Sequence, residues 1–405
     1  MTRPHSWNID ITNLPQLPEI KIGRGYDLLR EFEKLNQLRS TDLADAIAFY
    51  SARIIEVTVA DLALRLGLLQ KDRTDDLFNL LWAISESGSV QEGYLACANT
   101  LRRIGNSARH MNRSIYPEEI STIIALLQVW ITGWTKLASD GSIDLSQQSQ
   151  WSSLTSDIIS LTDNDAEKLT ALLSKNDTLD SPYYTEPTLA AFVVERLVDN
   201  NEQAASAFSE SLLARFPDDA RSRQVRALYL SRNGRFAESI ALLQELKHKD
   251  TETLGILGGA HKNIWLQTNN LEELKKAYAL YMEKPIIGAR NYYLTLNSAA
   301  TALWLKMYKE SWLLAQKTIN IMSRFNVNEN SLLHSKTAYW LTASYAEASF
   351  LLGRHKTALC LYQHAKEMDK TGGRWQRSAT QLTVHMRYFK ENKGYNKKYE
   401  KLIER

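Results

Sequence analysis

The sequence predicts an all-α protein in two parts, a helical bundle followed by a solenoid of helix pairs. The chain of 405 residues is long enough for two or three domains, and it contains only 8 Pro and 17 Gly, which favours long helices over a turn-rich β architecture. In the first third, apolar residues recur at close to 3.6-residue spacing, as on one face of a helix. In the second half, turn residues and small residues recur 34 positions apart, which is a period of helix-pair repeats.

The composition is that of an ordinary soluble globular protein, with 44% hydrophobic and 23% charged residues. Residues 1–8 contain no apolar run, so we expect no secretory signal. The most apolar segment, residues 120–134, is interrupted by polar side chains and is too short to span a bilayer. The two cysteines, Cys97 and Cys360, lie in separate helical patterns, which excludes a disulfide scaffold. We therefore expect a cytoplasmic protein that does not enter a membrane.

The net charge of +3 is unevenly distributed. Residues 138–186 hold nine acidic residues against two lysines, a net charge of −7. Residues 93–117 contain no acidic residue but include Arg102, Arg103, Arg109 and Arg113. Such a local positive field attracts phosphates or acidic partners. The alternative is that these arginines cap a helix end and pair with acidic residues elsewhere in the chain.

Four helices are expected in the N-terminal part, after an irregular arm over residues 1–26. They begin near residues 42, 74, 90 and 117. Gly67 ends the first of them, as a C-terminal glycine commonly does. Pro117, followed by two glutamates, opens the last. Helices with such short connections form a small bundle, and we assign residues 1–137 to the bundle and its arm.

The rest of the chain divides into a connector, residues 138–185, and a repeat array, residues 186–405. The connector is acidic and rich in Ser and Thr. Asn200 and Gly234 lie 34 positions apart at helix–helix turns, and later units carry their aromatic and small residues in similar order. Ala205 and Ser239, also 34 positions apart, supply a small residue five positions after each turn. One later unit contains Trp265, Leu271, Ala277 and Tyr281, the next contains Ala299, Trp304, Tyr308 and Ala315, and the last contains Ala346, Gly353 and Ala358. Each unit exposes an apolar face until its neighbour covers it.

The third helix of the bundle contains a motif of spaced polar residues. It reads Leu-Arg-x-x-Gly-Asn-x-x-x-His, with Leu101, Arg102, Gly105, Asn106 and His110. Over residues 40–137 the chain resembles the HEPN-like family that is often encoded beside restriction and defence enzymes. An earlier segment, Ala52–Glu56, is similar to the family's Ala-Arg-x-x-x-Glu but one residue shorter. The resemblance implies a helical bundle that forms a homodimer and serves antiviral defence.

Many HEPN domains are metal-independent ribonucleases, so the resemblance implies a catalytic site of Arg102, Asn106 and His110. These residues are four apart and lie on one face of a helix. The imidazole would move a proton while the ribose 2′-hydroxyl attacks the phosphate, and the guanidinium would hold the developing negative charge. The chain departs from the usual motif, because Gly105 stands where the family has its arginine. Arg103 is the alternative arginine, and no metal or cofactor is implied.

The alternative function is a non-catalytic adaptor with a degenerate HEPN-like domain. In that interpretation Arg102 pairs with Glu56 inside the bundle, and His110 caps the end of its helix, where a cation is favoured. Gly105 within a helix costs roughly 1 kcal/mol relative to Ala. A close approach of a second helix would explain this glycine, either inside the bundle or at a dimer seam.

The array is carried by the segments 251–258, 297–303, 339–343 and 346–348 with Gly353. Over residues 186–385 these segments resemble tetratricopeptide proteins, in particular the helical TRAFs-binding domain of certain stress-kinase kinases and its bacterial relatives. The resemblance implies a regulatory scaffold that binds a protein partner and has no catalytic activity. Five aromatic residues either line a peptide groove or belong to the core. They are Tyr292, Tyr293, Trp304, Trp312 and Trp340.

Overall fold

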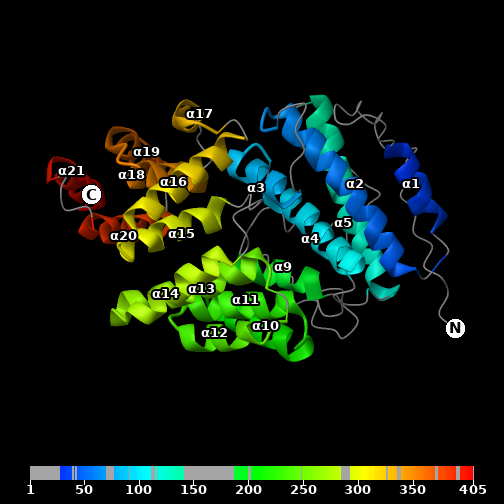
Figure 1. The fold of residues 1–405 in the computed structure, drawn as a ribbon. Coiled ribbons are helices and arrows are strands. Elements are labelled where there is room, and N and C mark those ends of the chain that lie inside the picture. The colour runs from blue at the N-terminus through cyan, green and yellow to red at the C-terminus, as the bar shows by residue number, and fades with distance from the viewer. Residues whose placement is uncertain are drawn as a thin grey trace. The chain divides into compact units, whose positions relative to one another are not determined.

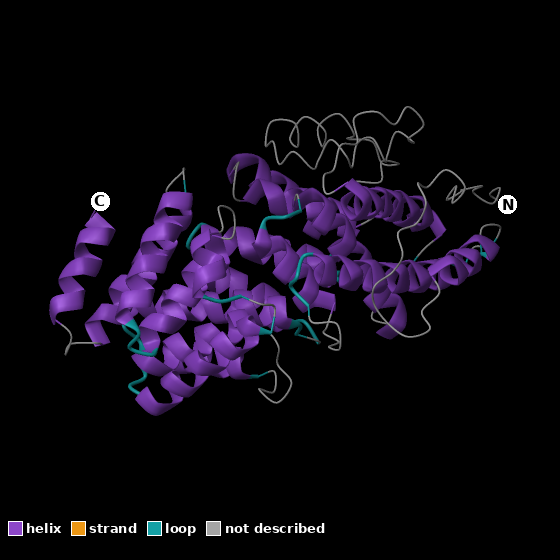
Figure 2. Ribbon diagram, turned by 90° about the horizontal axis from the view of Figure 1, so that it is seen from above, coloured by secondary structure: helices purple, strands orange, loops and turns teal. Residues whose placement is uncertain are grey.

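The protein is built from helices throughout the part of the chain that the structure describes. This computed structural model describes residues 28–38, 41, 43–69, 77–90, 92–110, 115, 117–140, 187–198, 202–247, 249–283, 292–324, 327–334, 339–369, 373–388 and 393–404. Within these ranges there is no strand (Figure 1 and Figure 2). The predicted all-α fold class is therefore confirmed.

The chain divides into two compact units, residues 1–85 with 89–229 and residues 86–88 with 230–405. The boundary between them falls within one helix, Ala220–Arg232. Most of the predicted connector, residues 138–185, lies outside the described part of the chain, and its first three residues belong to the helix Ile120–Asp140. The limits of the connector stay a prediction.

The first unit begins with the four bundle helices expected from the sequence and, before them, a helix over residues 28–37 that was not expected. They are α1 (Leu28–Gln37), α2 (Ala44–Arg65), α3 (Leu77–Ser87), α4 (Glu92–His110) and α5 (Ile120–Asp140), the last preceded by a short 3-10 turn, η2 (Pro117–Glu119). Gly67 follows α2 with a positive φ of 71°, a conformation that glycine adopts without steric cost. Pro117 opens the turn before α5, so both predicted helix boundaries are confirmed.

Two tryptophans anchor α5 against α2 inside the bundle. The indole N–H of Trp130 donates to Thr58 Oγ1 at 2.7 Å, and that of Trp134 donates to Asp61 Oδ2 at 3.1 Å. All four side chains are buried. Asp61 also pairs with Arg65 at 2.6 Å. Buried polar groups with partners cost little to desolvate and fix the register of the two helices.

The remaining helices pack against one another in adjacent pairs. They are α9 (Pro187–Val198), α10 (Glu202–Arg215), α11 (Ala220–Arg232), α12 (Phe236–Gln244), α13 (Thr251–Thr268), α14 (Leu271–Met282), α15 (Tyr292–Trp304), α16 (Tyr308–Ser323), α17 (Glu329–His334), α18 (Tyr339–Leu351), α19 (His355–Met368), α20 (Gly373–Tyr388) and α21 (Lys393–Glu404). In the second unit α13 packs on α14, α15 on α16 and α18 on α19. Gly234 and Gly353 both have positive φ at turns between helices, where the repeat pattern places them.

The small residues of the repeat pattern lie in the core. Ala205, Ala277, Ala299, Ala315, Ala346 and Ala358 are all fully buried. Large apolar side chains of adjacent helices occupy the space beside them, as in the cluster of Leu254, Ala277 and Tyr281. Small side chains at these positions allow the helices of a pair to approach closely.

Candidate functional site

The predicted ribonuclease residues lie on α4. Arg102 and Asn106 are both half-buried. The Nε of Arg102 donates to Asn99 Oδ1 at 3.0 Å, and its guanidinium lies 5.2 Å from the centre of the Phe78 ring. Arg103 is also half-buried. The side chain of His110 lies outside the described part of the chain, so the proposed grouping of Arg102, Asn106 and His110 stays a prediction.

The neighbouring arginines are engaged with acidic and aromatic side chains of the bundle. Glu56 pairs with Arg109 at 3.8 Å, and not with Arg102 as the adaptor hypothesis expected. Arg53 pairs with Glu31 of α1 at 3.0 Å. The guanidinium groups of Arg53 and Arg109 both lie over Phe49, at 5.9 and 5.8 Å from the ring centre. Part of the basic stretch therefore serves the bundle itself.

Gly105 marks the closest approach of α4 to α2. A Cβ atom added at this position would lie 2.1 Å from the Cβ of Ala52 and 3.3 Å from the carbonyl oxygen of Ala48. No side chain fits in that space, which accounts for a glycine inside a helix. The close helix approach predicted from the sequence is made within the chain.

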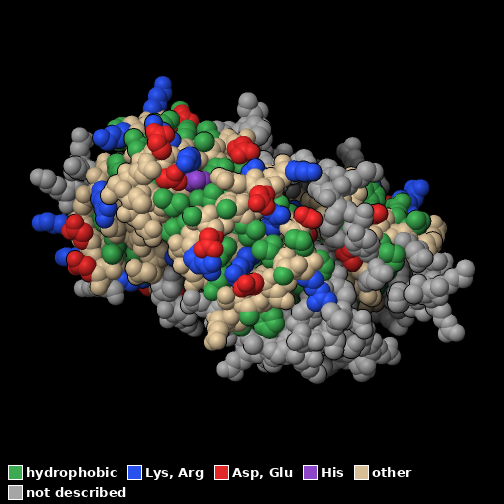
Figure 3. Space-filling model, turned by 90° about the horizontal axis from the view of Figure 1, so that it is seen from below, with side chains coloured by type: hydrophobic (Ala, Val, Ile, Leu, Met, Phe, Trp, Pro, Cys, Tyr) green, Lys and Arg blue, Asp and Glu red, His purple; other side chains and the backbone are tan. Residues whose placement is uncertain are grey.

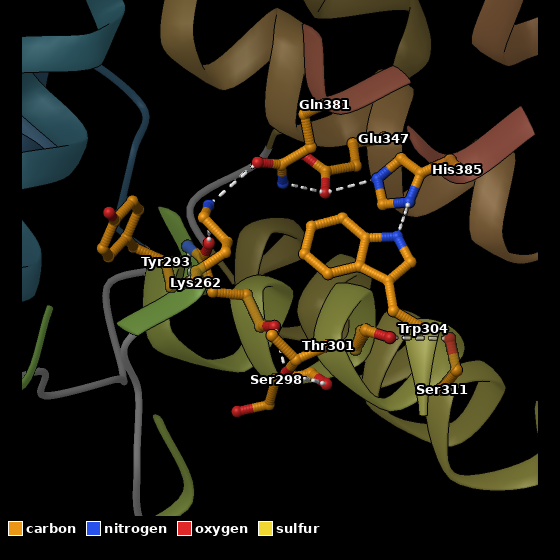
Figure 4. A network of polar contacts seen from close by, with 11 residues as sticks. Lys262, Tyr293, Ser298, Thr301, Trp304, Ser311, Glu347, Gln381 and His385 are labelled. Carbon is orange, nitrogen blue, oxygen red and sulfur yellow. Dashed lines mark hydrogen bonds and ion pairs between the residues drawn. The ribbon is translucent and has the colours of Figure 1, made fainter. Parts of the chain in front are cut away.

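A second group of polar side chains forms a connected network inside the second unit (Figure 4). Lys262 of α13 donates from Nζ to Asn297 Oδ1 of α15 at 3.1 Å and to Gln381 Oε1 of α20 at 3.0 Å. The amide nitrogen of Gln381 donates in turn to Glu347 Oε1 of α18 at 2.6 Å. One chain of hydrogen bonds thus joins α13, α15, α18 and α20.

His385 extends the network from Glu347 to Trp304. Glu347 Oε1 lies 3.0 Å from His385 Nε2, and the Trp304 indole N–H donates to His385 Nδ1 at 3.1 Å. An indole nitrogen can only donate, so Nδ1 is the acceptor and Nε2 carries the hydrogen that it shares with Glu347. This hydrogen-bond pattern assigns His385 as neutral, in its Nε2–H tautomer.

Aromatic rings close off this end of the network. Trp304 stacks on Trp265 with ring centres 5.1 Å apart, and Phe350 stacks on His385 at 5.7 Å. His385 has no exposed surface. At the other end Lys262 is half-buried, and burial lowers its pKa below the ordinary value, although the charge of Glu347 acts in the opposite direction.

Tyr281 of α14 lies beside this network without a hydrogen-bond partner. Its ring covers Gly258, where an added Cβ would lie 2.5 Å from Tyr281 Cε1. The side chain is buried, and its hydroxyl has no partner among the described residues. Burial raises the pKa of Tyr281 well above its ordinary value, and the nearby charge of Glu347 raises it further.

The five aromatic residues considered for a peptide groove separate into two groups. Tyr292 and Trp304 are buried and belong to the core. Tyr293, Trp312 and Trp340 are exposed. The interpretation as core is therefore correct for the first two, and only the other three can contact a partner.

One family comparison bears on this part of the chain. Residues 201–304 match the Tetratricopeptide Repeats-Sensor family. The C-terminal part is thus tetratricopeptide-like, as the repeat pattern predicted. No curated protein and no solved structure matches the chain.

The described residues include neither a helix that could cross a membrane nor a cluster that could hold a metal ion. None of their helices has the length and apolar character needed to cross a membrane. No cluster of three or more His, Cys, Asp or Glu side chains within them is arranged to hold a metal ion.

Sequence reasoning did not find the network of Lys262, Glu347 and His385. Its members are spread from α13 to α20, and no two of them form a motif. The sequence nevertheless contains a pattern that indicates close packing here: Gly255, Gly258 and Gly259 lie on one helix face in the two turns before Lys262. Glycines on one helix face indicate that something bulky packs there, and the structure shows that Tyr281 and Tyr293 do so.

Proposed function

We propose that the chain is a cytoplasmic regulatory protein whose tetratricopeptide-like part binds a protein partner. The helix pairs and the family match over residues 201–304 support a role in protein interaction. The observation that carries the proposal is a strip of exposed apolar side chains at the N-terminal end of α16, including its N-cap residue. We call it the α16 strip; it consists of Met307, Tyr308, Trp312 and Leu313.

The α16 strip has the character of a binding surface. Tyr308 is 56% exposed and Trp312, one turn later, is 48% exposed. Trp and Tyr are the residues that most often dominate interface energies. Buried Leu314 and Ala315 hold α16 against the rest of the second unit, so the strip is presented on a rigid element.

No large patch of one charge sign dominates the face of the described residues drawn in Figure 3. Acidic and basic side chains are interspersed on the face drawn in Figure 3. Several form local ion pairs, such as Arg235 with Glu238 and Lys275 with Glu272. Since the α16 strip itself is apolar and aromatic, we expect the partner to present an apolar helix or strand to Tyr308 and Trp312.

A crosslinking experiment tests this proposal. A photo-reactive amino acid at position 312 of the full chain should capture one protein in the source cells. The purified pair should then lose at least about tenfold in affinity on Trp312→Ala, because truncating a central aromatic costs about 2 kcal/mol or more. Leu271→Ala, which removes an equally exposed apolar side chain at the start of α14, is the matched control. Equal affinity of wild type and Trp312→Ala for the captured protein would refute the proposal.

RNA cleavage by a dimeric N-terminal bundle in a defence system is the second candidate function. The partial exposure of Arg102 and Asn106 on one face of α4 supports it. The contacts of Arg102 with Asn99 and Phe78 count against it, because a guanidinium held in this way must move before it contacts a phosphate.

Metal-free incubation with total RNA tests the second candidate. We expect cleavage by the wild type that His110→Ala and Arg102→Ala each reduce by about a hundredfold or more, while Arg53→Ala, at a pair within the bundle, retains it. A light-scattering mass should show a dimer. If wild type and His110→Ala cleave RNA equally, or if the protein is a monomer that cleaves no RNA, the ribonuclease function is refuted. The non-catalytic adaptor is then the remaining candidate function.

A further inference from the structure

The helix that carries the α16 strip also carries several positive charges. Residues 306–324 contain four cationic side chains and one acidic side chain, Glu310, a net charge of +3. Lys309 and Arg324 are exposed, whereas Glu310 is half-buried. The helix that presents Trp312 to solvent is therefore basic as well as aromatic.

Three of these cations lie on one side of the helix. Lys317 follows Lys309 by eight residues, and Arg324, the C-cap residue in helical conformation, follows Lys317 by seven. At about 100° and about 1.5 Å per residue, they lie within about 80° of one another around the axis and about 12 and about 10 Å apart along it. Leu313 of the α16 strip lies midway between Lys309 and Lys317. Apolar and basic side chains thus alternate along this side.

A fourth cation reaches the same side from the turn between α18 and α19. Nη2 of the exposed Arg354 donates to Gln316 Oε1 at 3.0 Å. Gln316 lies one turn after Trp312, and its amide nitrogen donates to Asn320 Oδ1 at 3.0 Å. Side-chain amides therefore position the guanidinium on α16 without compensating its charge. We use the name α16 cations for Lys309, Lys317, Arg324 and Arg354.

The like charges on this side of α16 repel one another. Burial lowers the pKa of Lys317, and the charge of Arg324 lowers it further. Binding of an anion relieves such repulsion, because opposite charges attract at short distance. The arrangement therefore favours an acidic ligand over a neutral one.

We propose that the α16 strip and the α16 cations together bind an acidic amphipathic helix of the partner. This inference rests on the proposed function and gives the chemistry of the partner at that same surface. Apolar side chains of the partner helix contact Tyr308 and Trp312, and its carboxylates pair with the α16 cations. A carboxylate can bind the guanidinium of Arg354 through two parallel hydrogen bonds.

The spacing on α16 defines the pattern expected in the partner. Since the cations on α16 recur every two turns, acidic residues should recur every two turns along the partner helix, with apolar residues between them. Complementary charges of this kind select the partner and speed its association. The exposed Met307 and Leu313 favour a peptide over a nucleic acid, because they provide no ring on which a base can stack.

Three designed helical peptides test the proposal on the full chain by fluorescence anisotropy. They share one apolar face containing Leu and Trp and differ only in the residue placed every two turns, which is Glu, Gln or Lys. We expect the Glu peptide to bind at least about tenfold more tightly than the Gln peptide, because each exposed ion pair contributes about threefold. The Lys peptide should bind most weakly, and added salt should weaken only the Glu peptide. If the Glu peptide does not bind, or if all three bind equally, the proposal is wrong.

Charge reversal in the protein tests which side chains recognise the acidic residues. Lys309→Glu and Arg354→Glu should each weaken the Glu peptide about tenfold and strengthen the Lys peptide, since attraction and repulsion exchange places. A merely structural role of these side chains would not produce that exchange. Lys397→Glu is the matched control, because it reverses an exposed cation on α21 and gives the same change in net charge. Equal effects of Lys397→Glu and Lys309→Glu would overturn the proposal.

Trp312→Ala separates this inference from the proposed function. If the Glu and Gln peptides bind equally and Trp312→Ala weakens both, the α16 strip binds a partner and only the assignment of an acidic helix fails. If Trp312→Ala leaves the Glu peptide unaffected while Lys309→Glu weakens it, the strip is not the binding surface and the proposed function fails. A single-stranded RNA oligonucleotide serves as the competing ligand. If it binds in place of the Glu peptide and Lys309→Glu weakens it, the surface recognises nucleic acid and the proposal is overturned.

Discussion

At the scale of single residues, Gly105 shows how a missing side chain sets the distance between two helices. The sequence indicated that this glycine needed an explanation, because it lies inside a helix. The structure provides it, since the Cβ of Ala52 occupies the space that a Cβ of residue 105 would need. The same residue belongs to the motif that resembles the HEPN family. Its presence is therefore explained by packing, without reference to catalysis.

Gly105→Ala should lower the free energy of unfolding by about 1–3 kcal/mol, because overpacking between two helices forces the backbones apart. Thermal unfolding of the full chain measures the effect. Gly259→Ala is the control, since the nearest atom to its added Cβ is 4.0 Å away; it should be neutral or stabilising by up to about 1 kcal/mol. Ala52→Gly in the Gly105→Ala background should restore part of the loss. Equal effects of the two glycine substitutions would show that the close approach is not the cause.

At the scale of helices and helix pairs, local pattern predicted the architecture well. The backbone of Gly67, Gly234 and Gly353 has a positive φ, which ends the preceding helix. Because this conformation depends only on nearby residues, the sequence could predict it. The contacts between paired helices were less predictable. His261 of α13 lies 2.5 Å from Glu273 of α14; His261 is buried and Glu273 is half-buried. Their spacing of twelve residues fits no motif, because it depends on how the turn between the helices folds.

Glu273 should make the α13–α14 pair sensitive to acid. Burial acts to raise the pKa of this carboxyl, but hydrogen bonds from Lys276 and His261 outweigh it, so that the pKa lies below the ordinary value. Its contribution to stability is therefore complete above the unfolded pKa, near 4.5, and is lost as the pH falls through the folded pKa.

Glu273→Gln should therefore lower stability at neutral pH by about 1–3 kcal/mol and have progressively less effect as the solution is acidified. Thermal unfolding of wild type and variant at a series of pH values measures this difference. Glu272→Gln is the control, because Glu272 is exposed and pairs only with Lys275 at the surface. A stability difference that stays constant between neutral and acid pH would contradict the role assigned to the carboxylate.

At the scale of the whole molecule, the second unit departs from a simple repeat array. In such an array each unit contacts only its neighbours. Here the hydrogen bond from Lys262 to Gln381 joins residues 119 positions apart and ties α13 to α20. Sequence could predict the helices that carry these side chains, but their meeting depends on the accumulated curvature of every helix pair between them. Small errors in each crossing angle add up over that distance, so the network was not predictable.

This long-range tie should make α13 and α20 unfold together. Gln381→Leu removes one acceptor of Lys262 and one donor to Glu347 at once, and leaves two half-buried charges each without one partner. We expect a loss of about 1–3 kcal/mol, with faster hydrogen exchange in α20 and equally in α13. Gln376→Leu, at an exposed position on α20, should change neither. Faster exchange confined to α20 would show that the array opens repeat by repeat and that the network does not couple its ends.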